Sequence, residues 1–233
     1  MNELKSQESS IKKGKAEEKP GRKKSLLREY AEAILIALAL ALFIRTFIVQ
    51  AFKIPSGSMI PTLNVGDHIL VNKFSYGLNI FRESYFGLNF PPKDINIISY
   101  RKPQRGDIVV FKFPEDESRD FIKRVIGVEG DRVEIKDKIV YINGKSLNKE
   151  PYTIYRDPDI KPKDVSQRDN FDPIDVPVGH IFVMGDNRDG SHDSRFWGFV
   201  NIRKVKGNAL IIYWSWDGDD HWVRWRRIGK LIY

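Results

Sequence analysis

One short segment places two serines where a hydroxyl could act as a nucleophile. Residues 52–62 read Phe-Lys-Ile-Pro-Ser-Gly-Ser-Met-Ile-Pro-Thr, so Ser56 and Ser58 flank a glycine between Pro55 and Pro61. The prolines fix φ and oppose a helix, and the glycine permits a sharp turn. Such a turn can hold the Ser58 hydroxyl beside backbone N–H groups, as a serine nucleophile with an oxyanion site requires. Taken alone, the segment is more typical of an ordinary proline-bounded loop.

The Ser58 hydroxyl needs a residue that accepts its proton, and cysteines and paired histidines do not supply one in this sequence. The chain has no cysteine, and its four histidines form no short ligand pair. In residues 121–127, Phe-Ile-Lys-Arg-Val-Ile-Gly, a strand would put Phe121, Lys123 and Val125 on one face. A lysine among apolar side chains is disfavoured as the ammonium, so its pKa falls and it can act as a neutral base. The alternative is an exposed strand lysine.

A third segment concentrates carboxylates, hydroxyls and glycines. Residues 184–198 read Met-Gly-Asp-Asn-Arg-Asp-Gly-Ser-His-Asp-Ser-Arg-Phe-Trp-Gly. A calcium loop fails on spacing, because Arg188 occupies the third ligand position. A solvated polar loop remains possible for an arbitrary sequence. Asp193 and Arg195 can instead pair and lock the loop, which leaves Ser191 free to bond to a neighbour.

The elements that must position these residues are mostly short strands. Alternating apolar segments separated by turn residues begin at Gly66, and Asn143-Gly144 is a strong hairpin signal. Residues 74–104 are expected to form a long loop and residues 148–178 an irregular excursion. The pattern predicts a mainly antiparallel β domain carried on one N-terminal helix. The predicted strands are 68–73, 107–113, 121–127, 131–135, 138–142, 180–184 and 208–214.

The N-terminal part of the chain indicates a tail and a membrane anchor. Residues 1–29 are rich in Lys, Glu and Ser and are expected to form a disordered basic tail in the cytoplasm. Residues 30–51 are expected to be a transmembrane helix. The uncharged part, 33–44, is shorter than the roughly 20 residues that span a bilayer. Counting on to Phe52 restores that length, with Arg45 near one end where it can reach the headgroups. The alternatives are a core helix and a secretory signal removed after Ala51.

The formal net charge of +8 raises the question of an acidic partner. Nine of the Lys and Arg residues lie in the first 30 positions, against five Glu. No nucleic-acid-binding motif is visible, so a membrane surface is the expected partner and nucleic acid is not. The tail from Trp214 to Tyr233 interleaves tryptophan with arginine, which fits strand packing, seating on a membrane or stacking on single-stranded nucleic acid. We expect no metal and no cofactor.

Taken in order, five segments resemble the conserved boxes of bacterial type I signal peptidase, the Ser-Lys family of leader peptidases. The resemblance runs from the apolar segment to about residue 216. It implies a catalytic β domain at 52–135 and 179–233, with a small inserted β subdomain at 136–178. The five segments are 55–63, 66–73, 105–111, 121–127 and 185–198.

The resemblance also implies a role for each candidate residue. Ser58 would be the nucleophile and Lys123 the general base. The hydroxyl of Ser56 and the backbone N–H of Ser58 would form the oxyanion hole, and Ser191 would orient the lysine. Gly190 departs from the asparagine of many members, which loosens the loop without touching a catalytic group. The supporting ion pair would be Asp193 with Arg195.

The function implied is that of a membrane-anchored serine endopeptidase. It would remove N-terminal signal peptides from exported preproteins after small residues, with preproteins and membrane lipid as partners. It would be a single-pass protein of the bacterial inner membrane, with its N-terminus in the cytoplasm and its catalytic domain on the other side. Two alternatives stay open: a self-cleaving repressor with the same dyad, and an anchored β-rich binding module without chemistry. The sequence is silent on oligomeric state.

Overall fold

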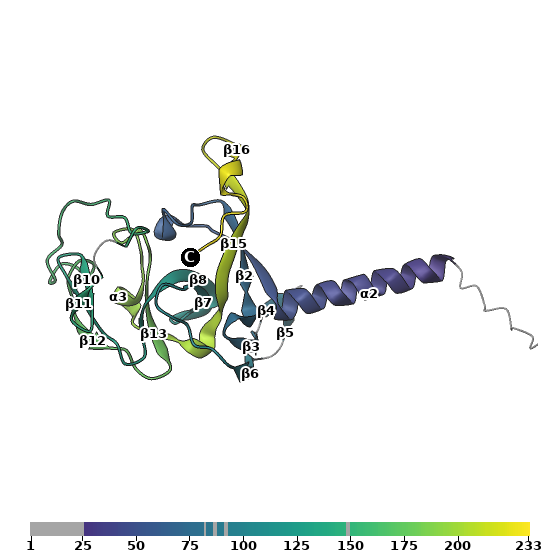
Figure 1. The fold of residues 1–233 in the computed structure, drawn as a ribbon, viewed down its shortest axis with the longest axis horizontal. Helices are drawn as coiled ribbons and strands as arrows, with labels where there is room; N and C mark the ends of the chain where they lie inside the picture. Colours follow the sequence, from purple (N-terminus) through teal and green to yellow (C-terminus); the bar gives the residue numbers. More distant parts are fainter. Residues whose placement is uncertain (1–25, 82, 86–87, 91–92, 148–149) are drawn as a thin grey trace, which may run out of the picture. The chain divides into compact units, whose positions relative to one another are not determined.

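The computed structural model describes residues 26–81, 83–85, 88–90, 93–147 and 150–233 (Figure 1). The predicted cytoplasmic tail lies outside these residues, except for its last four positions. The chain divides into two compact units, residues 1–41 and 42–233.

The first described element is the helix α2, Leu26–Phe47. Its large apolar side chains between residues 34 and 42 are all more than half exposed. Within the described ranges we find no helix with both the length and the apolar character needed to cross a membrane.

The boundary predicted for the anchor is wrong at its C-terminal end. The helix stops at Phe47, and Val49–Lys53 forms the strand β1 rather than further helix. β1 pairs in antiparallel register with the strand β2, Asp67–Asn72, from Val49 opposite Asn72 to Lys53 opposite His68. The backbone groups that would have lengthened the helix are therefore used in the sheet. The extra length counted through Phe52 is not available to a helix.

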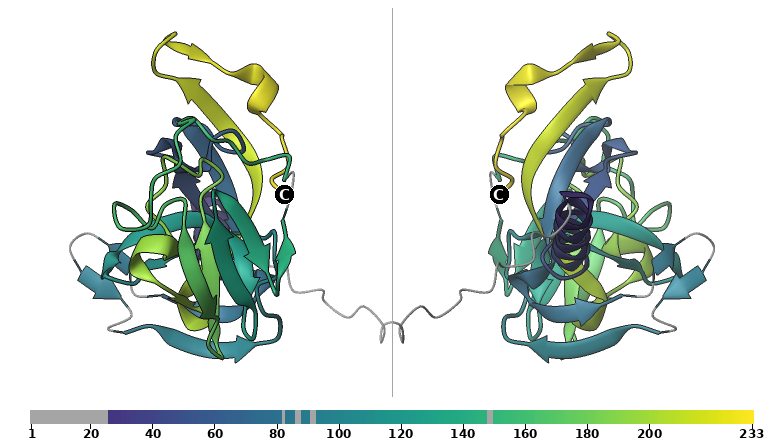
Figure 2. Two further views of the ribbon diagram at one scale, coloured as in Figure 1. Left: turned by 90° about the vertical axis from the view of Figure 1, so that its left-hand side faces the viewer. Right: turned by 90° about the vertical axis from the view of Figure 1, so that its right-hand side faces the viewer.

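Within the residues that the structure describes, the main sheet is antiparallel and has eight strands. This confirms the mainly β prediction. Figures 1 and 2 show its arrangement. In spatial order its first seven strands are β1 (Val49–Lys53), β2 (Asp67–Asn72), β15 (Val205–Asp217), β7 (Ile108–Phe113), β8 (Asp116–Val128), β13 (His180–Met184) and β14 (Val200–Asn201). β1 and β14 are therefore the two ends of this order. The eighth strand, the short β16 (Trp222–Val223), pairs with the C-terminal end of β15.

A second, four-stranded sheet packs against the end of β8 and β13 through a shared apolar core. Asn143 and Gly144 both have positive φ between β10 and β11, which confirms the predicted hairpin. Whether residues 136–178 behave as a separate subdomain stays a prediction. The strands, in spatial order, are β11 (Lys145–Ser146), β10 (Ile139–Ile142), β9 (Arg132–Lys136) and β12 (Phe171–Asp175).

The segment predicted as a long loop, 74–104, contains strands, so that prediction is wrong. Two separate two-stranded ribbons form there, β3 with β6 and β4 with β5. Glycine, asparagine and aromatic residues hid the alternation that marks a strand, because β6 is exposed along its whole length and has no buried face to read. The strands are β3 (Gly77–Ile80), β4 (Glu83–Tyr85), β5 (Leu88–Phe90) and β6 (Ile95–Ser99).

β8 is the strand that matters most for the site. It pairs with β7 from Asp116 to Arg124, whereas β13 pairs with it only from Arg124 to Val128. Its first half therefore has one free edge, and Lys123 lies where that free edge ends.

Candidate active site

Ser58 lies on a closed loop, residues 54–67, which we call the serine loop. The backbone closes its base: Ile54 N–H donates to Asp67 O (2.8 Å) and Gly66 N–H donates to Ile54 O (3.0 Å). The prolines and glycine predicted to give a stiff turn give instead a single 3-10 turn, η1, over Gly57–Met59. Ser58 sits in its middle and is only 8 % exposed.

The structure brings Ser58 and Lys123 together. Lys123 extends from β8, 65 positions further along the chain, and its Nζ donates to the Ser58 Oγ at 2.8 Å. The lysine side chain is buried, with 4 % of the residue exposed. No ion pair of Lys123 occurs within the described ranges. The predicted nucleophile and base are therefore in direct contact, inside the protein.

The environment of Lys123 favours the neutral amine. Burial lowers its pKa from the ordinary 10.5 to about 8, because a desolvated ammonium is unfavourable. The negative charges of Asp193 and Asp186 oppose this lowering of the pKa, and the positive charge of Arg195 reinforces it. The centre of the Phe121 ring lies 5.5 Å from Nζ. A base with such a pKa is effective near neutral to mildly alkaline pH.

Residues 185–198, which we call the aspartate loop, hold the serine turn from one side. Asn187 donates twice to it, from its backbone N–H to Ser58 O and from Nδ2 to Gly57 O, each at 3.1 Å. Gly185 packs so closely that an added Cβ would lie 2.4 Å from Ser58 O and 2.3 Å from Ser191 Oγ. A glycine is therefore required at this position for the two loops to touch.

Asp193 and Arg195 form a buried, two-point ion pair that shapes the aspartate loop. Arg195 Nε lies 2.8 Å from Asp193 Oδ1, and Nη2 lies 2.9 Å from Oδ2. Asp193 also accepts from the Gly185 N–H at 3.0 Å and caps the short helix α3, Ser194–Trp197. Burial alone would raise the pKa of Asp193, but the charge and hydrogen bonds of Arg195 keep it below its ordinary value.

Neither of the two other predicted serines has a side-chain hydrogen bond to Ser58 or Lys123 within the described residues. Ser191 is buried, and its hydroxyl lies close enough to Asp193 to help lower the pKa of that carboxyl. Its role in orienting the lysine stays a prediction. Ser56 is exposed just before η1, and its side chain does not cap that turn. Its hydroxyl is therefore not committed to holding the turn together.

Sequence reasoning missed a buried arginine next to the dyad. Arg124 and Asp186 pair at two points, both 2.8 Å, and Asp186 also accepts from the hydroxyl of Thr62 in the serine loop (2.5 Å). The Tyr152 ring covers the guanidinium 3.6 Å away. Strand alternation places Arg124 on the face opposite Lys123, but it does not indicate a buried partner for the guanidinium there. The only signal was the adjacency of two cations within an apolar strand.

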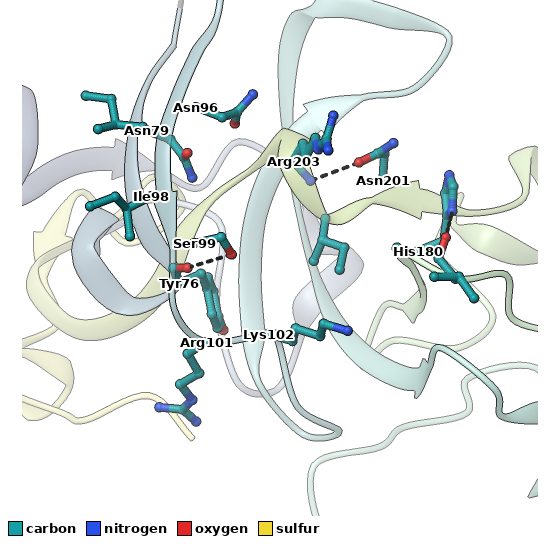
Figure 3. A pocket seen from close by; sticks show the side chains of 14 residues that line it. Tyr76, Asn79, Asn96, Ile98, Ser99, Arg101, Lys102, His180, Asn201 and Arg203 are labelled. Atoms are coloured by element: carbon teal, nitrogen blue, oxygen red, sulfur yellow. Dashed lines mark hydrogen bonds between the residues drawn. The ribbon is translucent and has the colours of Figure 1, made fainter.

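A cavity of about 710 Å³ lies apart from the dyad, between the β3–β6 ribbon and β14 (Figure 3). Asn79 and Asn96 line one side, and Asn201 and Arg203 line the other. Neither Lys123 nor any residue of the serine loop lines it. The cavity therefore takes no part in the chemistry of the Ser58 hydroxyl.

Comparison with known proteins identifies the family. A model of the family "Signal peptidase, peptidase S26" matches residues 27–214. The chain belongs to this peptidase family. The predicted resemblance and the prediction of an enzyme are both confirmed.

Individual members of the signal peptidase family give the same result. Signal peptidase I of Pseudomonas fluorescens is 39% identical over 239 residues, which cover 90% of this chain and 81% of that protein. Signal peptidase I of Pseudomonas aeruginosa PAO1 is 39% identical over 223 residues, covering 83% and 75%. A crystal structure of a signal peptidase I from Enterococcus faecalis V583 is 35% identical, covers 47% of this chain and 98% of that one, and has a TM-score of 0.37.

Proposed function

We propose that this chain cleaves N-terminal signal peptides from exported preproteins, with Ser58 as nucleophile and Lys123 as general base. Membership of the signal peptidase family supports the reaction. One observation supports the assignment of the residues: the buried Lys123 Nζ lies 2.8 Å from the Ser58 Oγ. A nucleophile and a base in hydrogen-bond contact are the minimum that acyl transfer by serine requires.

The dyad accounts for every proton in the reaction. Neutral Lys123 accepts the proton of the Ser58 hydroxyl as Oγ attacks the scissile carbonyl carbon. The new ammonium then gives that proton to the amine that leaves, and an acyl ester remains on Ser58. Lys123 next takes a proton from water, which attacks the ester carbonyl carbon. As the ester bond to Oγ breaks, the ammonium returns that proton to the Ser58 Oγ, which releases the cleaved signal peptide as a carboxylic acid and restores the dyad. The Ser58 N–H and the Ser56 hydroxyl would donate to the oxyanion in both halves of the reaction.

Two free strand edges near Ser58 suit an extended substrate. β1 is an end strand of the main sheet and leads directly into the serine loop, and the first half of β8 leads to Lys123. A polypeptide that pairs with such edges gains main-chain hydrogen bonds regardless of its sequence. Shallow apolar pockets beside them would then admit only small residues before the cut.

Membrane attachment and topology are part of the same proposal. The exposed apolar side chains of α2 favour transfer out of water, since burying apolar surface is favourable by about 25 cal/mol per Å². The N-terminus would lie in the cytoplasm and residues 52–233 on the opposite side of the inner membrane. Flotation of the full chain with lipid vesicles tests attachment, and an Ile36→Asp/Leu40→Asp variant should fail to float. Protease protection in right-side-out vesicles tests the orientation.

Mutation of the dyad tests the mechanism. The purified full chain is incubated with a preprotein, and the new N-terminus is identified by mass spectrometry. We expect cleavage after a small residue, lost in both Ser58→Ala and Lys123→Ala, with both variants still folded. Normal cleavage by either variant would refute the dyad.

A further inference from the structure

The chain ends in a strap that returns to the serine loop. Residues 218–233, which we call the strap, follow β15 and lie beyond the match to the family model, which ends at residue 214 (yellow in Figures 1 and 2). The strap contains β16 and the 3-10 turn η4, Trp225–Arg227. It is fixed to β15 by main-chain bonds, among them Ile212 N–H to Lys230 O (3.0 Å) and Ile232 N–H to Leu210 O (2.9 Å).

One arginine of the strap holds the serine loop at two points. Arg227 donates from Nε to Asp67 Oδ1 at 3.0 Å and from Nη2 to the backbone oxygen of Thr62 at 2.9 Å. Asp67 is fully buried, and its own carbonyl closes the base of the loop by accepting from Ile54. Arg227 therefore ties the base of the loop to the segment that follows Ser58.

Other contacts of the strap reinforce the same attachment. Arg224 donates to Ser215 Oγ at 2.9 Å, and that hydroxyl donates to Asp67 Oδ1 at 2.7 Å. Ile232 enters the apolar core that also contains Met59, the residue after Ser58. The strap thus contacts the loop through charge, hydrogen bonds and apolar packing.

Thr62 is hydrogen-bonded to both the aspartate loop and the strap. Its hydroxyl donates to Asp186 of the aspartate loop, while its carbonyl accepts from Arg227 of the strap. The residue is consequently held from both sides, four positions after Ser58. We infer that Arg227 is a positioning residue, through which the strap keeps the Ser58 hydroxyl within reach of Lys123. This inference rests on the proposed role of Ser58.

A positioning role and a purely structural role predict different kinetics. A misplacement of about 1 Å can cost about 100-fold in rate, because the reacting groups lose their alignment. Substrate binding at the strand edges would be unaffected, so KM would stay constant while kcat falls. If Arg227 only stabilised the fold, the activity of each folded molecule would be unchanged.

The decisive variant is Arg227→Lys, compared with Arg226→Lys. Lysine keeps a positive charge beside Asp67, but a single ammonium cannot reproduce the planar fork that reaches both the carboxylate and the Thr62 carbonyl. Arg226 lies on the same turn with its side chain exposed, which makes it the matched control. Arg227→Gln, which removes the charge as well, should give a larger loss.

Each full-length variant is assayed on a preprotein well below its measured Tm. For Arg227→Lys we expect kcat to fall about tenfold or more with KM within about twofold. The acid limb of its pH profile should move to higher pH, because a looser loop lets water reach Lys123. Arg226→Lys should match the unchanged chain in all three quantities.

The outcomes separate this inference from the proposed function. An unchanged kcat and pH profile in both Arg227 variants overturns the positioning role while leaving the dyad intact. Full activity of Ser58→Ala would instead remove the proposed function itself. If neither Arg227 variant folds, Ile232→Val makes a smaller change in the same strap. It should lower kcat without raising KM, and an unchanged kcat there rejects the inference as well.

Discussion

Two buried lysines on the same sheet make opposite use of burial. Lys123 on β8 is 4 % exposed and Lys206 on β15 is 5 % exposed, and each has a hydrogen-bond partner 2.8 Å from its Nζ. Aromatic rings lie near both, Phe121 beside Lys123 and Phe81 beside Lys206. The partners differ: Lys123 meets the Ser58 hydroxyl, and Lys206 meets the carboxylate of Asp120.

The partner decides what burial does to the amine. A desolvated ammonium costs several kcal/mol unless an anion lies in contact with it. Asp120 supplies that anion to Lys206 in an ion pair. Ser58 is neutral, so the burial of Lys123 lowers its pKa to about 8. We therefore expect a buried lysine to serve as a base when its contact partner is a hydroxyl, whereas a carboxylate partner holds the lysine in an ion pair.

Removal of the Lys123 amine should have the largest effect on activity. Lys123→Met should reduce cleavage by about 1,000-fold or more, since loss of one member of a nucleophile–base pair abolishes most of the acceleration. The measurement is the initial rate on a preprotein, with folding checked by circular dichroism. Residual activity within tenfold of the unchanged chain would contradict the assignment of Lys123 as base.

The pH profile should report the lowered pKa of Lys123. Only the neutral amine accepts the Ser58 proton, so kcat/KM should rise about tenfold per pH unit below about 8 and level off above it. The measurement is kcat/KM from pH 6 to 10, because its pH dependence reports the pKa values of the enzyme without bound substrate. A plateau that extends to pH 6 would mean that another group acts as the base.

Giving Lys123 an anionic partner should make it resemble Lys206. In Phe121→Glu a carboxylate replaces the ring 5.5 Å from Nζ, which should raise the pKa of Lys123. We expect the acid limb to move up by about one unit and the rate at pH 8 to fall about fivefold. Glutamine has nearly the same shape as glutamate but no charge, so Phe121→Gln should keep the acid limb of the unchanged chain. If the acid limb moves equally in both variants, the cause is the loss of the Phe121 ring and not the added carboxylate.

Ser191→Ala should have a smaller effect. The hydroxyl makes no hydrogen bond to the side chain of Ser58 or Lys123, so the variant should lose activity only by a few-fold. A loss above about 100-fold, measured as kcat/KM, would mean that Ser191 bonds to the lysine once substrate is present.

Lys206→Met should leave the rate alone and lower stability. It leaves Asp120 without this ion pair, but Asp120 is exposed to water, so the loss of stability should be small, about 1 kcal/mol or less. Urea unfolding measures that loss, and kcat of the folded protein should stay within twofold. A tenfold loss of kcat would show that the sheet between the two lysines couples them.

The dyad could be predicted from the sequence because its members lie in strong local patterns. A Pro-Ser-Gly-Ser turn and an apolar strand with one inward lysine each suggest a role, and the order of the five segments joins them. The ion pair of Arg124 with Asp186 could not be found in this way. Alternation shows which residues share a face but not whether the opposite face is also covered, and here Tyr152 covers it.

The errors in the fold have a similar origin. Val49–Lys53 continues the apolar character of α2, so composition alone extends the helix into what is strand β1. Its partner β2 lies beyond the serine loop, and no local pattern reveals that pairing. The strap shows the same limit, because the contacts of Arg227 with Asp67 cross 160 positions of chain.

The bare α-carbon of Gly185 has a practical consequence. Even a methyl group there would lie within 2.4 Å of the carbonyl of Ser58, so the smallest side chain must push the attacking residue away from its amine. Gly185→Ala would retain every reacting atom and still be a slow peptidase. Such a variant could capture an uncleaved preprotein with the native serine and lysine in place, which substitution of either residue cannot do.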